Sequence, residues 1–480
     1  MKNLIEIARI VARRKVKQLE VFDASYLTQK DNKFNLFYQA LATNKLKNDR
    51  DAATLLYDSS PTDARYRQLK SRFRKRLLNT LFLLDLPSGN ASRYERAFYA
   101  CNKDWNLVKI LLDNQAPNAA AHLARQCLNN ALGFQFSEII LHCSRVLLHQ
   151  SAETGNTKDF EYYQQLITTH GPLLKAEIEA ETLYQEFKLL YSIHKSPASP
   201  PSTQIEEIQK KLQDLSIRYE STHVRYYYYL SKILFLEAGG NYAQLLLVCE
   251  QAETYFTQHR DHFPEDKIII LFTRKMAAYL YLKDYKNGKN TAEKYLVHFS
   301  EGSDNWFIFM EFYFLLAMHN RQYIQASAIL EKARQHPKFK RYELAARQTW
   351  KVFEYSMLYI TVRLGSEFPV LAQKSKNQSK VNTLLEEPDI YRKENKYSTS
   401  SLLLLKILFL IDRHSLLKAQ ELIENLKENA AKYLKAEEDF RILQFIRLLQ
   451  QAAKANFQVS ELKNEDKYLD VGLDSFSGFM

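Results

Sequence analysis

The sequence predicts an all-α protein, and three observations support that fold class. Glycine and proline number only 11 each in 480 residues, which is too few turn formers for an all-β or doubly wound fold. Lys, Glu, Leu, Ala and Gln fill the sequence between aromatic residues, a composition that favours long helices. The 30 tyrosines and 28 phenylalanines supply large apolar side chains for packing helix against helix.

Residues 1–100 carry most of the excess positive charge. They hold 20 Lys and Arg against 10 Asp and Glu, and so account for +10 of the net charge of +12. Such an asymmetry indicates a nucleic acid, an anionic surface or an acidic partner at this end. Residues 2–22 are expected to form an amphipathic helix with a basic side. Both a membrane-surface or nucleic-acid helix and a capping helix with a solvated charged face remain open.

Three further helices are expected over Phe34–Leu41, Asp49–Tyr57 and Asp63–Leu84, with Asn48 or Asp49 as the cap of the second. The third helix gathers apolar residues on one side and basic residues on the opposite arc. The segment DAATLLYDSSPTDARYRQLKSRFRKRL resembles the helix-turn-helix of sigma-factor-like regulators. That resemblance implies that the second of these two helices enters the major groove of DNA. The residues it would use are Arg65, Arg67, Gln68, Arg72, Arg74, Lys75 and Arg76. The alternative is a solvated face on the first helices of a solenoid.

From Tyr94 onward the spacing of apolar residues predicts helix pairs with little interruption. The stretch KSPASPPST, residues 195–203, is expected to be an exposed loop or a boundary. Residues 366–398 are expected to be an irregular insertion with one short helix near Val381–Leu385. The other helices are expected over Ala119–Ala131, Phe136–Gln150, Phe160–His170, Leu174–Tyr191, Ile205–Tyr219, Thr222–Ala238, Tyr242–Gln258, Asp266–Leu282, Tyr285–Phe299, Tyr342–Leu364, Ser400–Asp412, Leu416–Leu434 and Glu438–Ala455, with Gly133 joining the first two.

The stretch from Asn305 to Pro337 is the clearest helix pair. A long apolar helix is followed by a polar turn and by a shorter helix that begins at Tyr323 and has Ala326 and Ala333 at set places. A helix pair of this kind cannot bury both of its apolar faces alone, so it needs a similar pair stacked on each side.

Two other pairs share this pattern of an aromatic residue followed by small residues. Tyr242, Tyr285 and Tyr323 each open the second helix of a pair, and lie 43 and 38 residues apart. The pattern resembles the tetratricopeptide repeat, most clearly over residues 222–337. The first two copies match it in part, through Ala252 and Gly288, and Phe314 replaces the small residue of the first helix in the third copy. The resemblance implies a right-handed superhelical α-solenoid of antiparallel helix pairs with a binding groove.

No catalytic, cofactor or metal motif is recognised in the sequence, since there is no phosphate loop, dinucleotide fingerprint or nucleophile elbow. His259 and His262 lie three positions apart, but no third ligand is nearby, so a surface loop is favoured over a metal site. The longest apolar run, Leu402–Ile411, contains Lys406 and is too short to span a bilayer. The cysteines are isolated in the sequence, which suits a reducing, cytoplasmic location. They are Cys101, Cys127, Cys143 and Cys249.

These patterns predict a non-enzymatic scaffold or adaptor that binds a protein or peptide in the solenoid groove, without a cofactor or metal. Tyr226, Tyr228 and Tyr229 are candidate groove residues. The alternative is a nucleic-acid-binding regulator that uses residues 49–84 as a helix-turn-helix and the solenoid as its sensor domain. The expected segments are a basic helical module (1–90), a first helical-repeat segment (91–195), tetratricopeptide-like repeats (204–365), the insertion (366–398), C-terminal helical repeats (399–462) and a flexible tail (463–480).

Overall fold

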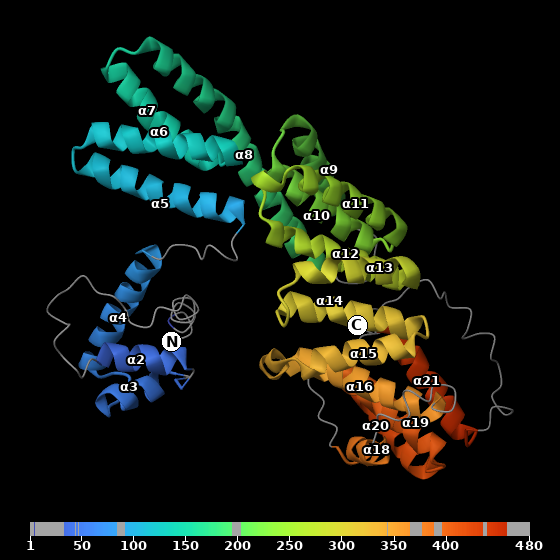
Figure 1. Ribbon diagram of the computed structural model, residues 1–480. Coiled ribbons are helices and arrows are strands. Elements are labelled where there is room, and N and C mark those ends of the chain that lie inside the picture. The colour runs from blue at the N-terminus through green and yellow to red at the C-terminus, as the bar shows by residue number, and fades with distance from the viewer. Residues whose placement is uncertain are drawn as a thin grey trace. The chain divides into compact units, whose positions relative to one another are not determined.

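The computed structural model shows an all-α protein, which confirms the predicted fold class. It describes residues 4, 33–43, 45–46, 48–83, 92–193, 203–342, 344–364, 377–387, 396–434 and 439–457. These residues form 19 α-helices and no strand, and no helix among them is long and apolar enough to cross a membrane. The expected helix over residues 2–22 and the expected tail over residues 463–480 lie outside the described residues. The chain divides into two compact units, residues 1–170 and 171–480 (Figure 1).

In the first unit, three helices share a small hydrophobic core that includes Phe37 and Phe73. The side chain of Asn48 caps the second helix, as the sequence predicts. Asp49 ties the second helix to the third, because its carboxylate accepts hydrogen bonds from the Tyr66 hydroxyl and the Lys70 ammonium, each at 2.6 Å. The three helices are α2 (Lys33–Ala42), α3 (Asp49–Tyr57) and α4 (Ala64–Leu83).

The rest of the first unit is a second group of helices with its own core. The expected joint at Gly133 is wrong, because the helix continues through Gly133 and ends at Phe134, followed by Gln135, which has a left-handed φ of 57°. Ala131 is fully buried and Phe134 packs against the same core, so burial stabilises the last turn beyond the glycine. The helices are α5 (Arg93–Asp113), α6 (Pro117–Phe134), α7 (Ser137–Glu153) and the start of α8 (Thr157–Ile193).

The two helices predicted over Phe160–His170 and Leu174–Tyr191 are a single helix, α8, which continues through Pro172. Proline removes one backbone hydrogen bond and usually ends or kinks a helix. Here both ends of α8 are held by packing: Tyr163 is buried in the first unit, and Phe187 is fully buried in the second. The structure therefore contradicts the predicted break, because tertiary packing on both sides outweighs the proline.

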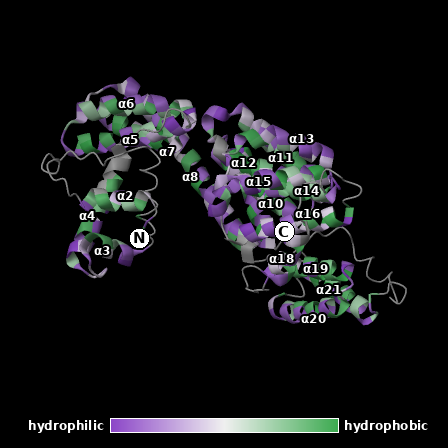
Figure 2. Cartoon of the chain, turned by 60° about the horizontal axis from the view of Figure 1, so that its bottom comes forward, coloured by the Kyte–Doolittle hydropathy of each residue, from purple (hydrophilic) through white to green (hydrophobic). Residues whose placement is uncertain are grey.

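The second unit is a succession of helices in which each contacts its neighbours in the chain (Figure 1). In addition, α12 contacts α14 and α16 contacts α19, so first helices of successive pairs also meet. Along helices such as α6 and α20, hydrophobic residues alternate with hydrophilic ones, as expected where one face is buried (Figure 2). The helices are α9 (Thr203–Arg218), α10 (Thr222–Ala238), α11 (Tyr242–Gln258), α12 (Ile269–Tyr281), α13 (Tyr285–Tyr295), α14 (Asp304–His319), α15 (Tyr323–Gln335), α16 (Leu344–Leu364), α18 (Asn377–Glu386), α19 (Lys396–Asp412), α20 (Leu416–Tyr433) and α21 (Phe440–Lys454). This helical repeat-like arrangement is compatible with a solenoid.

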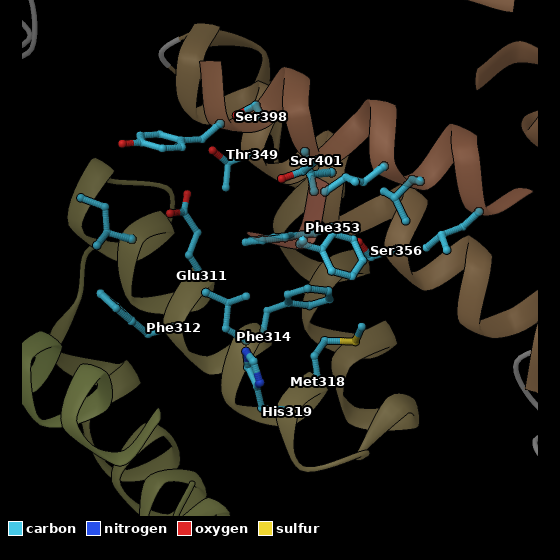
Figure 3. A pocket seen from close by; sticks show the side chains of 18 residues that line it. Glu311, Phe312, Phe314, Met318, His319, Thr349, Phe353, Ser356, Ser398 and Ser401 are labelled. Carbon is cyan, nitrogen blue, oxygen red and sulfur yellow. The ribbon is translucent and has the colours of Figure 1, made fainter. Parts of the chain in front are cut away.

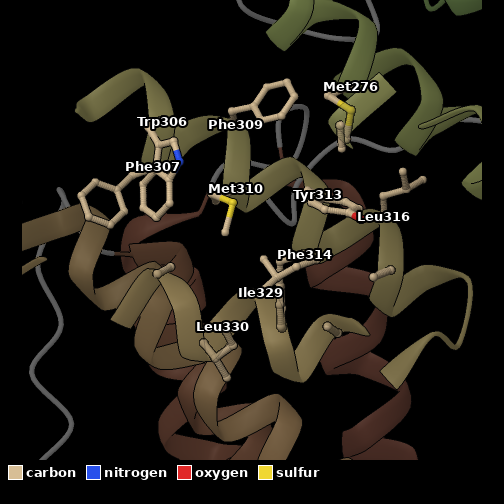
Figure 4. Packing of buried hydrophobic residues seen from close by; sticks show 14 of the residues in the cluster. Met276, Trp306, Phe307, Phe309, Met310, Tyr313, Phe314, Leu316, Ile329 and Leu330 are labelled. Atoms are coloured by element: carbon tan, nitrogen blue, oxygen red, sulfur yellow. The ribbon is translucent and has the colours of Figure 1, made fainter. Parts of the chain in front are cut away.

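One of the two large cores of the second unit is built around α14 and α15 (Figure 4). Trp306 and Phe309 on α14 are almost completely buried there. Two small residues that the repeat pattern singles out, Ala326 and Ala333, are fully buried in this core. A methyl group added at Gly288 would lie 2.3 Å from Leu316 Cδ2, so only glycine fits this place without a shift of its neighbours.

Candidate binding cavity

A cavity of about 630 Å³ lies in the second unit, lined by α14, α16, α19 and α21 (Figure 3). The first three are the first helices of successive pairs, since α14 packs on α15, α16 on α18 and α19 on α20. The wall is mostly apolar and includes five aromatic rings, those of Phe312, Phe314, Phe353, Tyr397 and Phe445. A cavity of this size and lining is typical of a ligand-binding site.

Ring contacts and one buried ion pair hold the wall of the cavity in place. Phe314 stacks on Phe353 with 4.5 Å between the ring centroids. On the α19 side, the Tyr397 hydroxyl donates to Asp439 Oδ1 at 2.8 Å, and Lys396 Nζ donates to Asp439 Oδ2 at 3.0 Å. Asp439 is completely buried just before α21, so it joins the start of α19 to the start of α21. These contacts hold the side chains of Phe314, Phe353 and Tyr397 in the wall.

Glu311 is the only acidic side chain among the described residues that line the cavity. Its Oε1 atom is buried and has no hydrogen-bond partner among the described residues, and the same is true of Trp350 Nε1 on α16. Burial raises the pKa of Glu311 to about 8, and the nearby Trp350 indole offsets part of the rise. At neutral pH this carboxyl group is therefore mostly protonated.

The other polar groups of the cavity are hydroxyls and one imidazole. In Figure 3 the carboxyl group of Glu311 points toward the side of the cavity that holds Thr349, Ser398 and Ser401. His319 is the last residue of α14. Burial and, to a smaller extent, the charge of Lys283 lower the pKa of this imidazole. The site can therefore bind an apolar body and one polar or charged group, which is the chemistry of recognition.

The three tyrosines predicted to line a groove lie on α10, outside this cavity. Tyr229 is buried and packs near Tyr255 and Phe256, so little of its surface is free for a partner. Tyr226 is half-buried, with its ring 4.7 Å from that of Phe263, and Tyr228 is half-buried beside Tyr229. Whether any of them binds a partner remains a prediction.

The basic residues predicted to bind nucleic acid lie on α4. Arg67, Gln68, Arg72, Arg74 and Lys75 are exposed, on the side opposite the buried core of α2–α4. Arg65 differs, because its guanidinium pairs with Asp63 at 2.8 Å and lies over the Tyr57 ring. The side chain of Arg76 lies outside the described part of the structure. The connection between α3 and α4 spans residues 58–63, and Asp58 at its start has a left-handed φ of 48°.

Three of the four cysteines that are isolated in the sequence come together on α5, α6 and α7. Cys101 Sγ lies 3.9 Å from the Cys127 carbonyl oxygen, and Cys127 also interacts with Cys143. All are free thiols. The contact with Cys101 lowers the pKa of Cys127, but the contact with Cys143 and burial outweigh it and raise that pKa to about 12. In the described part of the chain, no group of three or more His, Cys, Asp or Glu residues is placed to hold a metal ion. His259 instead contacts the Tyr255 carbonyl oxygen through Nδ1 at 2.8 Å.

Sequence reasoning missed both the cavity and Glu311. The signal for Glu311 was present, because it is the only charged residue between Trp306 and Met318 in an otherwise apolar and aromatic run. A lone carboxyl group in such a run must be either exposed or buried at a cost. The second signal was Phe314, the residue that departs from the repeat pattern and forms part of the cavity wall.

Comparison with known proteins gave no match: no family model fits the chain, and no curated protein or solved structure is significantly similar to it. The tetratricopeptide and helix-turn-helix resemblances therefore rest on the residues given above and remain predictions.

Proposed function

We propose that this protein is a non-enzymatic helical-repeat scaffold or adaptor that binds a protein or peptide in a groove of a tetratricopeptide-like, right-handed superhelical solenoid. The observation that carries the proposal is the cavity itself, whose wall comes from α14, α16 and α19, the first helices of successive pairs. In a solenoid of helix pairs, equivalent helices of each repeat form one extended concave surface suited to binding. The free, buried cysteines support a reducing, cytoplasmic location for this function.

A screen of random peptides displayed on phage against the purified full-length protein tests this proposal. The blocking variant is Ser401→Trp, because Ser401 lies in the cavity wall and an indole there would fill part of the space. The matched control is Ser379→Trp on α18, where the serine is exposed and outside the cavity. We expect peptides that bind the wild type and the control but not the blocking variant.

Thermal unfolding followed by circular dichroism must first show that the variants fold like the wild type. If Ser401→Trp is unfolded, Ser398→Trp replaces it as the blocking variant, since Ser398 lies in the same wall. Peptides that bind the blocking variant as well as the wild type would place binding elsewhere. The absence of any enriched peptide would contradict the scaffold proposal.

A second candidate function is a nucleic-acid-binding regulator, which the exposed basic side of α4 favours. Arg67, Arg72, Arg74 and Lys75 are exposed, and no ion pair within the described part of the chain involves them. Gln68 is exposed among them and is the one side chain there suited to reading a base edge. In this candidate, residues 49–84 bind the nucleic acid and the helical repeats act as the sensor.

The test measures binding to mixed duplex DNA and to RNA at low and moderate salt. For four phosphate contacts on duplex DNA, the logarithm of the binding constant should fall with the logarithm of salt concentration with a slope of about −3.6. Changing Arg67, Arg72, Arg74 and Lys75 to Glu should abolish binding. The control changes four exposed lysines elsewhere to Glu, which gives the same net charge, and should bind like the wild type; these are Lys210, Lys211, Lys418 and Lys432. Equal loss in both variants would indicate only a non-specific effect of net charge.

A further inference from the structure

The Trp350 indole is the polar neighbour that lowers the pKa of the buried Glu311 carboxyl group, but it offsets only part of the rise that burial causes. The Oε1 atom of Glu311 has no hydrogen-bond partner of normal geometry among the described residues, and leaving a buried polar atom unsatisfied is unfavourable. The side chain lies on the wall of the cavity rather than inside the packed core. A leucine at this position would satisfy the apolar surroundings at a lower cost. The unfavourable burial of this carboxyl group is explained if a cationic group of a binding partner enters the cavity and pairs with it.

The groups around Glu311 fit one kind of cation better than another. An ammonium group has three N–H donors, whereas a planar guanidinium has five. The Glu311 carboxylate and the hydroxyls of Thr349, Ser398 and Ser401 lie on the same side of the cavity, which is enough for three donors (Figure 3). The aromatic and aliphatic wall suits an alkyl stem and neighbouring apolar side chains.

We propose that this cavity receives the ammonium group of a lysine side chain, carried on an apolar segment of the partner protein, with Glu311 as its counter-ion. The inference rests on the proposed scaffold function and names the class of segment that the groove binds. Charge complementarity supports it, because Glu311 is the only acidic group in the described wall and its carboxylate is otherwise without an opposite charge there.

Glu311 is the acidic group of the described wall, and its pKa is raised to about 8. On α14, desolvation and then the charge of Lys283 lower the pKa of His319, away from this value. On α19, burial raises the pKa of Tyr397, and Lys396 behind it is paired with Asp439 at the start of α21. The lining residues of α16 and α21 carry no charge.

Binding of a lysine should therefore release a proton below pH 8. The empty cavity holds Glu311 mostly in its neutral form, and the bound ammonium favours the carboxylate, so the proton leaves as lysine enters. Affinity should rise about tenfold per pH unit from pH 6.5 to about 8, and then level off, because a lysine in water stays charged until about pH 10.

The test resynthesises the groove-binding peptides from the phage screen and measures their affinity for the full-length protein by fluorescence anisotropy. Each peptide is compared with versions in which its lysine is acetylated or replaced by norleucine, which keep the stem and remove the charge. We expect the enriched peptides to contain a lysine next to apolar residues and to lose at least about tenfold in affinity at pH 8 when that charge is removed.

Protein variants complete the design. Glu311→Gln should weaken lysine peptides at pH 8 by at least about tenfold and remove their pH dependence. The control Glu331→Gln, at an exposed carboxylate on α15 outside the cavity, should change neither. An independent measurement is proton release in calorimetric titrations in buffers of different ionisation enthalpy, which should be present in the wild type and absent in Glu311→Gln.

The outcomes separate this inference from the scaffold proposal. Peptides that are excluded by Ser401→Trp but need neither a lysine nor Glu311 would overturn the inference and leave the scaffold function standing. If no peptide binds, both fail. In that case, binding of the free amine 4-phenylbutylamine, detected by ligand-observed NMR and lost in Glu311→Gln, would identify a free amine rather than a partner's lysine.

Discussion

The two sides of α14 are packed in different ways. Toward α12, α13 and α15, its residues meet glycine and alanine, and the contact is so close that Gly288 leaves no room for a methyl group beside Leu316. Toward α16 and α19, Phe314 meets Phe353 ring on ring, and a cavity of about 630 Å³ remains around Glu311. One helix therefore contributes both to a closely packed seam and to the cavity.

This difference shows that one helix can combine close packing on one side with open space on another. Small residues let two helices approach closely and exclude water, which gives well-packed and stable contacts. On the other side of α14, the rings of Phe314 and Phe353 stack with 4.5 Å between their centroids, and both rings line the cavity. The departure of Phe314 from the repeat pattern thus coincides with the site.

The largest expected effect is a difference in stability between variants of two adjacent leucines of α14, of which one faces the seam and the other lines the cavity. Leu316 is completely buried in the seam, whereas Leu315 is partly buried and lines the cavity. Leu316→Ala should lower the free energy of unfolding by about 3 kcal/mol, because it leaves a void among rigid neighbours. Leu315→Ala should lower it by roughly 1 kcal/mol, because its side chain already faces open space.

Urea unfolding of both variants, followed by circular dichroism, measures the difference. The midpoint of the first transition is the quantity to compare, since a long helical array can unfold in parts. Equal losses in the two variants would mean that the cavity is closed in solution and that the two sides of α14 are packed alike.

The second prediction concerns the loss of stability caused by the Glu311 carboxyl group on the cavity side of α14. Its pKa is raised from 4.5 to about 8 in the folded protein, so the folded state holds this proton more tightly than the unfolded state. The stability that the protonated carboxyl group contributes is fully present below the unfolded-state pKa of 4.5. It is lost as the pH rises toward the folded-state pKa of about 8. Glu311→Gln should therefore gain stability relative to the wild type, by about 2 kcal/mol between pH 6 and pH 7.5.

Unfolding curves recorded at several pH values for the wild type, Glu311→Gln and the control Glu331→Gln check this prediction. The gap between the wild type and Glu311→Gln should grow with pH and become constant above about pH 8, while the control shows no such trend. A gap that does not change with pH would mean that Glu311 is already ionised in the folded protein.

The fold was largely predictable from the sequence because local signals agree with packing. The bounds of α10 and α11 match the prediction, since Gly239 and Gly240 separate two strongly apolar helices and Asn241 caps the second. The start of α3 at its Asn48 cap is equally local. The break expected near Pro172 fails because packing at both ends of α8, which no local signal carries, outweighs the proline.

The site was not predictable, because it depends on which helices meet. Glu311, Thr349 and Ser401 belong to three helices that are far apart in the chain, and nothing in the sequence brings their side chains to one cavity. The cysteines are a second example of contacts that depend on which helices meet. Cys101 and Cys127 are 26 residues apart in the sequence and contact each other in the fold. Tyr229 belongs to a run of four tyrosines, a pattern that does not distinguish core from surface, and its side chain is buried.

The smallest expected effect is that of replacing Gly288, the glycine in the seam beside Leu316. Alanine is the better helix former by about 1 kcal/mol, so Gly133→Ala in α6, where nothing lies within 4 Å of the added methyl group, should stabilise the protein by about that amount. In Gly288→Ala the same gain is opposed by Leu316 Cδ2 and by Tyr279 Cβ, which lies 3.1 Å from the added methyl group. We expect a net loss of about 1 kcal/mol.

The source of that loss can be isolated in a double-mutant cycle with Leu316→Ala, measured by the same urea unfolding. In the shortened background the leucine methyl is gone, and the new alanine methyl can occupy part of the void. Gly288→Ala should then be neutral or stabilising, so that the two changes couple by about 1 kcal/mol or more. If Gly288→Ala costs the same in both backgrounds, the leucine is not what requires glycine, and the close approach of α13 to Tyr279 on α12 is the reason instead.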